Sequence, residues 1–427
     1  MRAYVVDTGR LIAPFDEPPG DALFAQTTMG ASVRDAFVRR GIEIVDVKID
    51  DVVAAYDAKE PCIVVCDHTF VSDKALGDFL DKALDVVSGA PAGAACARLA
   101  LAKTASADFT RPVSSVHTEP FDERGPGARP SIKKRNRFTS EELEAKERVA
   151  YDCFLVKDVP AGVRAREWLE ALRKDAVRVV VEKRELGIPL RLPVLGDGKE
   201  TRALVPITST IAAHVEHWVH ILWLNQLAFG MRWMEIARTE KLWGFGRALA
   251  AFPWTSTSRF MRAYVKKGRN VRIHPTAHVE ASILGDNVVV GARASVRNCI
   301  LGDGVEIGDH AAVLSCTIGA DAYVTPRTFV VWGAAYPKAV ITNYKLQVSL
   351  VGRGASLSTW AGMVDAKLQG TVSVQHDGKI VDTERSFIGS CIGHGAFVGG
   401  KVLIMPGRAI PNGAFIAMRP DELIYEV

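Results

Sequence analysis

Aliphatic residues recur every six positions through the last third of the chain. The clearest run ends near the C-terminus, and glycine, proline and asparagine fill its gaps. This period fits neither a helix nor a plain strand and indicates a parallel β-helix of hexapeptides, with one inward aliphatic residue per hexad and three hexads per coil. The positions, including three steps of five, are Ile273, Val279, Leu284, Val290, Val296, Leu301, Ile307, Val313, Ile318, Val324, then Val351, Leu357, Met363, then Ile392, Val398, Ile404, Ile410 and Ile416.

Residues 1–210 have a different pattern, in which short apolar runs alternate with helical segments. Residues 3–6, 42–47 and 62–66 read as strands, and residues 31–40 read as a helix that stops at Gly41. Ser72 is placed to cap a second helix that runs to about Val86. Strands alternating with helices predict a parallel sheet covered by helices.

Residues 119–137 interrupt this pattern with glycine and proline beside a cluster of basic side chains, from 124 to 137. They are interpreted either as a solvated loop or as an arm that meets a phosphate-bearing substrate or an anionic surface. Thr139 and Glu142 have the spacing of a capping box, which predicts a charged helix after the loop.

Residues 211–268 contain five of the eight tryptophans and many basic residues, which predicts one or two amphipathic helices between the domains. Such helices pack against a neighbouring domain or lie at a membrane surface, here through residues 218–262. His214, His217 and His220 would share one helical face. They are either zinc ligands or hydrogen-bonded histidines at a domain interface.

Length and composition bound the remaining possibilities. A chain of 427 residues predicts two or three domains, here 1–210, 211–268 and 269–427. A net charge of +4 gives no reason to expect a nucleic-acid partner. The seven cysteines have no zinc spacing and read as reduced thiols. Without a signal-peptide pattern or a long uncharged apolar run, a cytoplasmic protein is expected, with membrane association as an option.

Two short motifs carry a family resemblance. Residues 374–379 (Val-Gln-His-Asp-Gly-Lys) interrupt the hexads before residues 387–389, and Cys66-Asp67-His68 follows a strand. With the domain layout, they resemble the two-domain sugar-phosphate nucleotidylyltransferases of the N-acetylglucosamine-1-phosphate uridylyltransferase type. The resemblance implies an α/β nucleotidyltransferase-like (GT-A-type) N-terminal domain, a C-terminal left-handed parallel β-helix and a homotrimer.

The resemblance also implies candidate site residues. In the family, the loop corresponding to Gln375, His376, Asp377, Gly378 and Lys379 lines the sugar and acetyl-CoA site between subunits. These residues are therefore expected to bind substrate. His376 is the candidate for the catalytic base, with His394 as the alternative.

Two further positions come from the same resemblance. Thr359 stands where the family has its catalytic histidine, so it is expected to contact substrate without acting as the base. Asp67 matches the aspartate that holds Mg²⁺. The glycine-rich nucleotide loop of the family is missing here.

The favoured function is therefore acyl transfer from an acyl-CoA to a nucleotide sugar or sugar phosphate at the β-helix, beside a degenerate nucleotidyltransferase domain. One alternative is a non-catalytic sugar-nucleotide-binding or scaffold protein. Another is an active nucleotidylyltransferase with Mg²⁺ at Asp67, and a third is a peripheral membrane enzyme.

Overall fold

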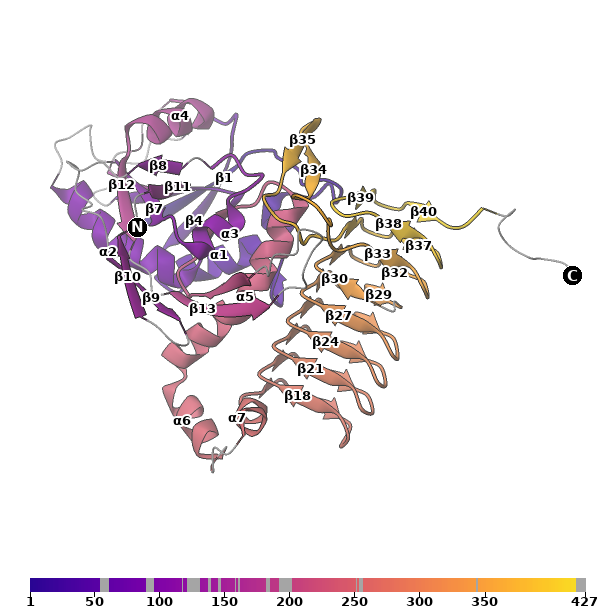
Figure 1. Ribbon diagram of the computed structural model, residues 1–427. Helices are drawn as coiled ribbons and strands as arrows, with labels where there is room; N and C mark the ends of the chain where they lie inside the picture. Colours follow the sequence, from indigo (N-terminus) through magenta and orange to yellow (C-terminus); the bar gives the residue numbers. More distant parts are fainter. Residues whose placement is uncertain are drawn as a thin grey trace, which may run out of the picture.

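A computed structural model describes residues 1–53, 61–89, 96–116, 118–120, 131–136, 140–144, 147–157, 159, 162–181, 185–191, 202–250, 252, 256–342 and 345–419. Figure 1 shows an α/β domain beside a long stack of parallel coils, with helix α5 between them. No helix among the described residues is long and apolar enough to cross a membrane.

The N-terminal domain is built on a mixed sheet in the order β12-β7-β11-β5-β1-β4, with β8 paired to β11. Strands β1, β4 and β5 run parallel, as the sequence predicts, whereas β11 runs antiparallel between β5 and β7. The strands are β1 Arg2–Asp7, β4 Glu43–Lys48, β5 Cys62–Cys66, β7 Cys96–Ala102, β8 Thr118–Pro120, β11 Glu147–Val156 and β12 Val177–Val181.

Helices cover this sheet, and two of them begin at side-chain caps. Thr28 accepts the Ala31 N–H at the start of α1, and Ser72 accepts the Ala75 N–H at the start of α2, which confirms the cap predicted at Ser72. The remaining elements here are α1 Met29–Val38, α2 Asp73–Ser88, α3 Ala105–Thr110, α4 Ala165–Asp175, the short 3-10 helix Pro19–Asp21, β2 Leu23–Phe24, β3 Thr27–Thr28, β6 Thr69–Val71 and β15 Ala212–His214.

The described parts of the basic segment predicted as a loop and a helix are strands. β9 Ser131–Asn136 pairs with β10 Ser140–Glu144, and β9 also pairs with β13 Glu185–Arg191, which pairs with β14 Arg202–Ile207. The capping-box prediction at Thr139 and Glu142 is therefore wrong from residue 140 onward, because pairing between strands overrides a local helix signal. The rest of the predicted loop, 121–130 and 137–139, lies outside the described residues.

The C-terminal part is a parallel β-helix, as the hexad period predicts. Leu284 pairs with Leu301 and Leu301 with Ile318, so each of these coils stacks on the next after 17 residues. The inward aliphatic residues of the central coils, such as Val296, Ile318 and Val324, are fully buried. Each coil thus buries its apolar residues against the coils above and below it.

The β-helix has three faces, and a hairpin projects from one coil. Its strands are β16 Lys266–Lys267, β19 Ile283–Leu284, β22 Ile300–Leu301, β25 Thr317–Ile318, β28 Ala334–Ala335, β31 Leu350–Val351, β36 Cys391–Ile392 and β39 Ala409–Ile410 on the first face; β17 Arg272–Ile273, β20 Val289–Val290, β23 Glu306–Ile307, β26 Tyr323–Val324, β29 Val340–Ile341, β32 Ser356–Leu357, β37 Phe397–Val398 and β40 Phe415–Ile416 on the second; β18 His278–Glu280, β21 Ser295–Arg297, β24 Ala312–Leu314, β27 Phe329–Val331 and β30 Leu346–Gln347, with the pair β33 Gly362–Met363 and β38 Leu403–Ile404, on the third; and the hairpin β34 Ser373–His376 and β35 Lys379–Asp382.

Helix α5 (Trp218–Thr239) joins the two parts by packing against both of them. Trp218 and Trp223 are buried in a core shared by the two parts, and the Asn225 amide donates to the Leu23 carbonyl of the N-terminal domain at 2.7 Å. Gln226 donates to the Trp332 carbonyl of the β-helix at 2.8 Å. This half of the predicted membrane segment 218–262 is therefore an interdomain helix, and only α6 (Lys241–Ala250) and α7 (Thr257–Ala263) remain open to a surface.

Candidate functional site

The candidate site begins where two parallel strands of the N-terminal sheet end. β1 and β5 are neighbours, so Thr8 and Asp67, which follow them, meet at one edge. The Thr8 hydroxyl donates to Asp67 Oδ1 at 2.7 Å, and the Thr8 backbone N–H donates to the same oxygen at 3.2 Å. Asp67 Oδ2 is buried and has no hydrogen-bond partner among the described residues. A buried carboxylate oxygen without a donor is placed to meet a cation.

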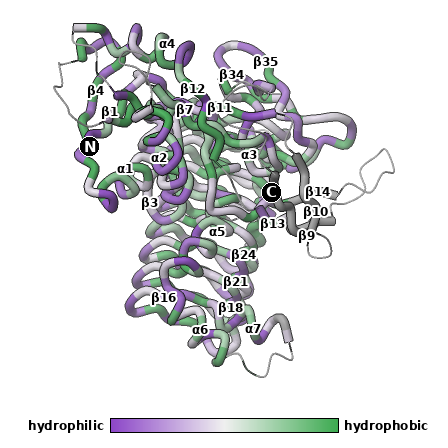
Figure 2. Tube along the Cα trace, turned by 90° about the vertical axis from the view of Figure 1, so that its left-hand side faces the viewer, coloured by the Kyte–Doolittle hydropathy of each residue, from purple (hydrophilic) through white to green (hydrophobic). Residues whose placement is uncertain are grey.

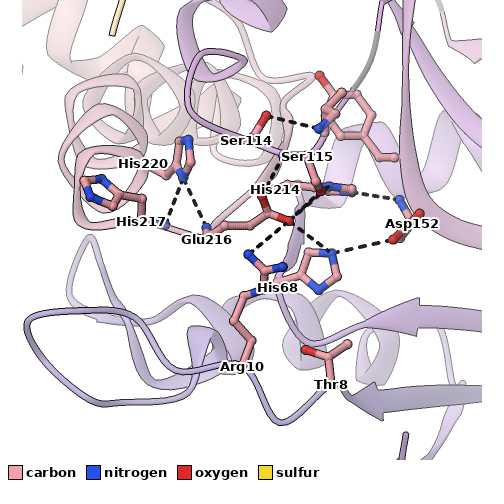
Figure 3. A network of polar contacts seen from close by, with 12 residues as sticks. Thr8, Arg10, His68, Ser114, Ser115, Asp152, His214, Glu216, His217 and His220 are labelled. Atoms are coloured by element: carbon pink, nitrogen blue, oxygen red, sulfur yellow. Dashed lines mark hydrogen bonds and ion pairs between the residues drawn. The ribbon is translucent and has the colours of Figure 1, made fainter. Parts of the chain in front are cut away.

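His68 lies among three carboxylates, of which Asp152 and Glu216 are labelled in Figure 3. Its Nδ1 is 3.6 Å from Asp67 Oδ1, and its Nε2 is 3.6 Å from Asp152 Oδ2 and 3.9 Å from Glu216 Oε1. Burial by itself would lower the pKa of His68, but the neighbouring carboxylates of Asp152, Asp67 and Glu216 outweigh burial and raise this pKa. The surrounding carboxylates thus favour the protonated form of this imidazole.

Asp152 is fully engaged by two arginines. It lies in β11, and its Oδ1 accepts a hydrogen bond from Arg98 Nη2 at 2.8 Å. Its Oδ2 accepts from Arg173 Nη2 at 2.6 Å and Nε at 3.0 Å, a forked contact that suits guanidinium geometry. Burial would raise the pKa of Asp152, but His68, His214 and Arg173 hold it well below its usual range. Asp152 therefore serves as the counter-ion of the site.

Glu216 and Ser115 form the opposite wall. Glu216 follows β15, and its two carboxylate oxygens accept the Ser115 backbone N–H and hydroxyl, each at 2.6 Å. Arg10 Nη1 lies 3.7 Å from Glu216 Oε1. Although burial would raise the pKa of Glu216, His214, the Ser115 donors and Arg10 lower it to about 2. Glu216 is thus ionised and orients Arg10.

His214 is neutral and has no nitrogen left for a metal. Its Nε2 accepts the Asp152 backbone N–H at 3.0 Å, so its proton is assigned to Nδ1, which faces the Ser115 hydroxyl at 3.4 Å. Burial, together with the charge of His68, lowers the pKa of His214 to about 3. Nε2 is therefore occupied as a hydrogen-bond acceptor, and Nδ1 carries the proton.

The predicted row of three histidines on one helical face is wrong. His214 belongs to β15 and His217 is the N-cap of α5, so only His220 lies in the helix. His217 Nε2 donates to the Gln375 carbonyl at 3.1 Å, and His220 Nε2 donates to the Pro112 carbonyl at 2.8 Å. The helical spacing fails because the helix begins at Trp218. These histidines do not form a zinc site together.

Two other groups of side chains lie close enough to hold a cation: Cys66, His68 and Asp152, and His68, His214 and Glu216. Both are compromised, because burial keeps the pKa of the Cys66 thiol high, Asp152 is held by arginines and His214 lacks a free lone pair. The unpartnered Asp67 Oδ2 is a better fit, and a carboxylate oxygen is the ligand that Mg²⁺ prefers.

Two cavities border this site. One of about 520 Å³ is lined by Thr8 and His68, together with four arginines. The other, of about 610 Å³, is lined by Cys66 and Asp67 and by residues of β1, β4 and α1. The Thr8–Asp67 hydrogen bond therefore connects the walls of two cavities. The four arginines are Arg10, Arg98, Arg166 and Arg173.

The other predicted site residues lie on the β-helix. Gln375, His376 and Lys379 belong to the hairpin β34–β35, whose two-residue turn is Asp377-Gly378, both with positive φ. The His376 ring is 5.2 Å from the His217 ring, so the hairpin contacts the N-terminal domain of its own chain.

Thr359 does not belong to this hairpin. It lies at an exposed corner between β32 and β33. The structure thus joins the hairpin to the wall of the N-terminal site through His217, which follows Glu216 directly.

Asp152, Glu216 and Ser115 were missed by sequence reasoning. Asp152 had a usable signal, because it is a lone charge inside the apolar run of β11. Glu216 stands between two histidines but in no recognisable motif, and Ser115 had no signal at all.

The strand pairing defines the architecture of the chain: an α/β domain built on a mixed sheet, followed by a hexapeptide β-helix. Residues 260–333 match the family described as GlmU-like, C-terminal hexapeptide. This match confirms the resemblance expected from the hexads. No curated protein matches the chain.

Several solved structures align with parts of the chain. The inositol-1-phosphate CTP transferase from T. maritima is 9% identical over 42% of this chain and 84% of its own, with a TM-score of 0.25. A hexapeptide transferase family protein from Anaplasma phagocytophilum is 16% identical over 37% and 81%, with a TM-score of 0.16. The acetyltransferase domain of PglB from Neisseria gonorrhoeae FA1090 is 18% identical over 36% and 55%, with a TM-score of 0.13. Because these TM-scores are low, the fold class rests on strand pairing and the family match.

Proposed function

We propose that this chain is a transferase whose reaction takes place at the Thr8–Asp67 pair of the N-terminal domain. Its substrates would be a nucleoside triphosphate and a sugar phosphate, and its product a nucleotide sugar. The observation that carries this proposal is that Thr8 and Asp67, joined at 2.7 Å, line two different cavities. Two cavities whose walls are joined by one hydrogen bond suit a reaction between two bound substrates.

The arginine-lined cavity is the place for a phosphate group. Arg98 and Arg173 hold Asp152, and Arg166 is paired with Asp50 at 2.9 Å. Arg10 is less committed, since its ion pair with Glu216 is longer, at 3.7 Å. We therefore assign the phosphate of the sugar substrate to Arg10, which Glu216 and Ser115 orient.

The reaction follows from this placement. An oxygen of the sugar phosphate would attack the α-phosphorus of the triphosphate, and the bond from that phosphorus to the β-phosphate oxygen would break, releasing pyrophosphate. A Mg²⁺ ion bound at Asp67 would supply charge neutralisation for the phosphates. Thr8 donates two hydrogen bonds to Asp67 Oδ1, which fixes the carboxylate group. Oδ2 is left available to the ion.

The test measures pyrophosphate release and Mn²⁺ binding with purified protein, a panel of nucleoside triphosphates and a panel of sugar phosphates. Asp67→Asn should lower release by about 100-fold or more and weaken Mn²⁺ binding. Asp85→Asn, an exposed aspartate of α2, is the matched control and should change neither. If wild-type protein neither releases pyrophosphate nor gains thermal stability with any triphosphate and Mg²⁺, the proposal is wrong.

Acyl transfer from an acyl-CoA at the β-helix is the second candidate. The observation that favours it is the hairpin turn at Asp377-Gly378, which presents Gln375, His376 and Lys379 beside the N-terminal domain. This function would use a cleft between copies, so it also requires the homotrimer, which light scattering would measure. A thermal shift with acetyl-CoA that disappears in His376→Ala would support it. Binding of nucleotide sugars without any turnover would favour the scaffold alternative.

A further inference from the structure

One end of the molecule combines an exposed apolar helix face with concentrated positive charge. We call residues 238–272 the basic tip; they include α6, α7, β16 and the first residue of β17. Figures 1 and 2 both show α6 and α7 at the β18 end of the β-helix, far from the hairpin β34–β35. The basic tip is therefore remote from the candidate site.

The outward face of α6 is apolar. Leu242, Phe245 and Leu249 have exposed fractions of 90%, 66% and 59%, and Phe252, just after the helix, has 68%. Spacings of three and four place the three helical residues on one face. No residue of α6 is buried. A helix face that leaves three large apolar side chains exposed to water is unusual.

The inner face of α6 holds the helix in this orientation. The Trp243 ring packs 5.9 Å from Trp233 and 6.1 Å from Tyr264. Arg247 donates to the Ala263 and Val265 carbonyls at the end of α7. Because these contacts fix one side of α6, the apolar residues on the other side cannot turn inward.

The charge of the basic tip selects an anionic partner. Residues 238–272 contain nine basic residues and one acidic residue, Glu240, so they carry +8 while the whole chain carries +4. Lys266 is paired with Glu240 and Arg269 with Asp286. Five further cations have no ion pair among the described residues: Lys241, Arg259, Arg262, Lys267 and Arg272.

We propose that the basic tip docks on the surface of an anionic lipid membrane, with the apolar face of α6 in the headgroup boundary and the unpaired cations on the phosphates. A short helix with an apolar face and flanking Lys and Arg is the arrangement that lies in such an interface. Since no described helix can cross a bilayer, the contact is peripheral.

Flotation of the full chain with vesicles tests this proposal. The protein should bind mixed phosphatidylcholine–phosphatidylglycerol vesicles, bind pure phosphatidylcholine vesicles weakly, and lose binding at high salt. The double variant Phe245→Asp, Leu249→Asp should bind about tenfold or more weakly. Both side chains are exposed, so the variant should keep the wild-type circular dichroism and thermal transition.

Phe415→Asp is the matched control, because Phe415 is 75% exposed at the opposite end of the β-helix. It should bind vesicles like the wild type, and an equal loss in this control would overturn the proposal. Absence of binding to anionic vesicles at low salt would also overturn it. So would a self-association, measured by sedimentation, that the Phe245→Asp, Leu249→Asp variant abolishes, because a second copy of the chain would then cover the face.

Discussion

Glu17 and His394, which are 377 positions apart in the sequence, meet where the N-terminal domain contacts the β-helix. His394 Nδ1 accepts the Arg353 backbone N–H at 2.8 Å, so the proton lies on Nε2, which donates to Glu17 Oε2 at 3.2 Å. Glu17 Oε1 accepts a hydrogen bond from the buried Tyr336 hydroxyl. One carboxylate thus fastens two coils of the β-helix to the first loop of the chain.

Removing this carboxylate should weaken the contact between domains. Glu17→Ala leaves the Tyr336 hydroxyl buried without an acceptor, which should lower the free energy of unfolding by about 1–3 kcal/mol, measured by chemical denaturation. Tyr336→Phe removes the stranded donor, so the double variant should be less destabilised than the sum of the two single variants. Additive effects would show that the two residues act independently.

Asp152 and Asp67 should separate stability from cation binding. Asp152→Ala leaves Arg98 and Arg173 without their counter-ion, which should cost about 3–5 kcal/mol of unfolding free energy. Asp67→Asn loses only part of the acceptor geometry that receives the Thr8 hydrogen bond. It should therefore lower the unfolding free energy by less than Asp152→Ala does, while it weakens Mn²⁺ binding. Thermal unfolding and metal titration on the same samples measure both effects. Equal destabilisation by the two variants would contradict this division of roles.

Acid should destabilise the fold through its buried histidines. Burial lowers the pKa of His214 and His217 to about 3 and that of His220 to about 4. At a pH between these values and about 6.5, the unfolded chain binds more protons at these histidines than the folded chain does. The free energy of unfolding therefore falls as the pH drops below about 6.5. His217→Asn keeps an N-cap acceptor and removes one of these groups.

The His217→Asn variant should lose less stability between pH 6.5 and 5 than the wild type, by up to about 1.4 kcal/mol per pH unit. Denaturation at several pH values measures this slope. Between pH 7.5 and 8.5 the two proteins should show the same slope, because His217 is neutral in both folded and unfolded states there. If the variant and the wild type had the same slope below pH 6.5, this would contradict the buried, neutral state of His217.

Adding one carbon atom at a glycine between two stacked coils should destabilise the β-helix. A Cβ on Gly302 would lie 2.6 Å from the Ala320 backbone nitrogen of the next coil. Gly302→Ala should therefore lower the unfolding free energy by about 1–3 kcal/mol. A Cβ on Gly246 meets nothing within 4 Å, so Gly246→Ala in α6 should be neutral or stabilise by up to about 1 kcal/mol. Thermal unfolding of both variants checks the contrast.

The sequence predicts the β-helix well and the candidate site poorly, for physical reasons. One inward residue per hexad is a local, periodic signal, and residues such as Val296 and Val324 are buried as that signal requires. The site instead depends on which strands become neighbours. His68, Asp152 and Glu216 come from three separate parts of the chain, and no local pattern links them.

Local signals also fail where pairing or a helix boundary decides the outcome. The segment around Glu142 has the spacing of a helix start, yet it pairs with β9. The histidine row is lost because α5 begins only at Trp218. Asp67 was the one residue that the family resemblance assigned to the N-terminal site, and it lies in that site. Its binding of Mg²⁺ remains a proposal.

The division of charge along the molecule has one more consequence. Because residues 238–272 carry +8 and the whole chain +4, the rest of the chain carries −4, and the protein has a permanent electric dipole. Near a negatively charged surface, such a molecule rotates before it touches. The α6 end would lead, and the two cavities at the other end would stay open to substrates arriving from the water.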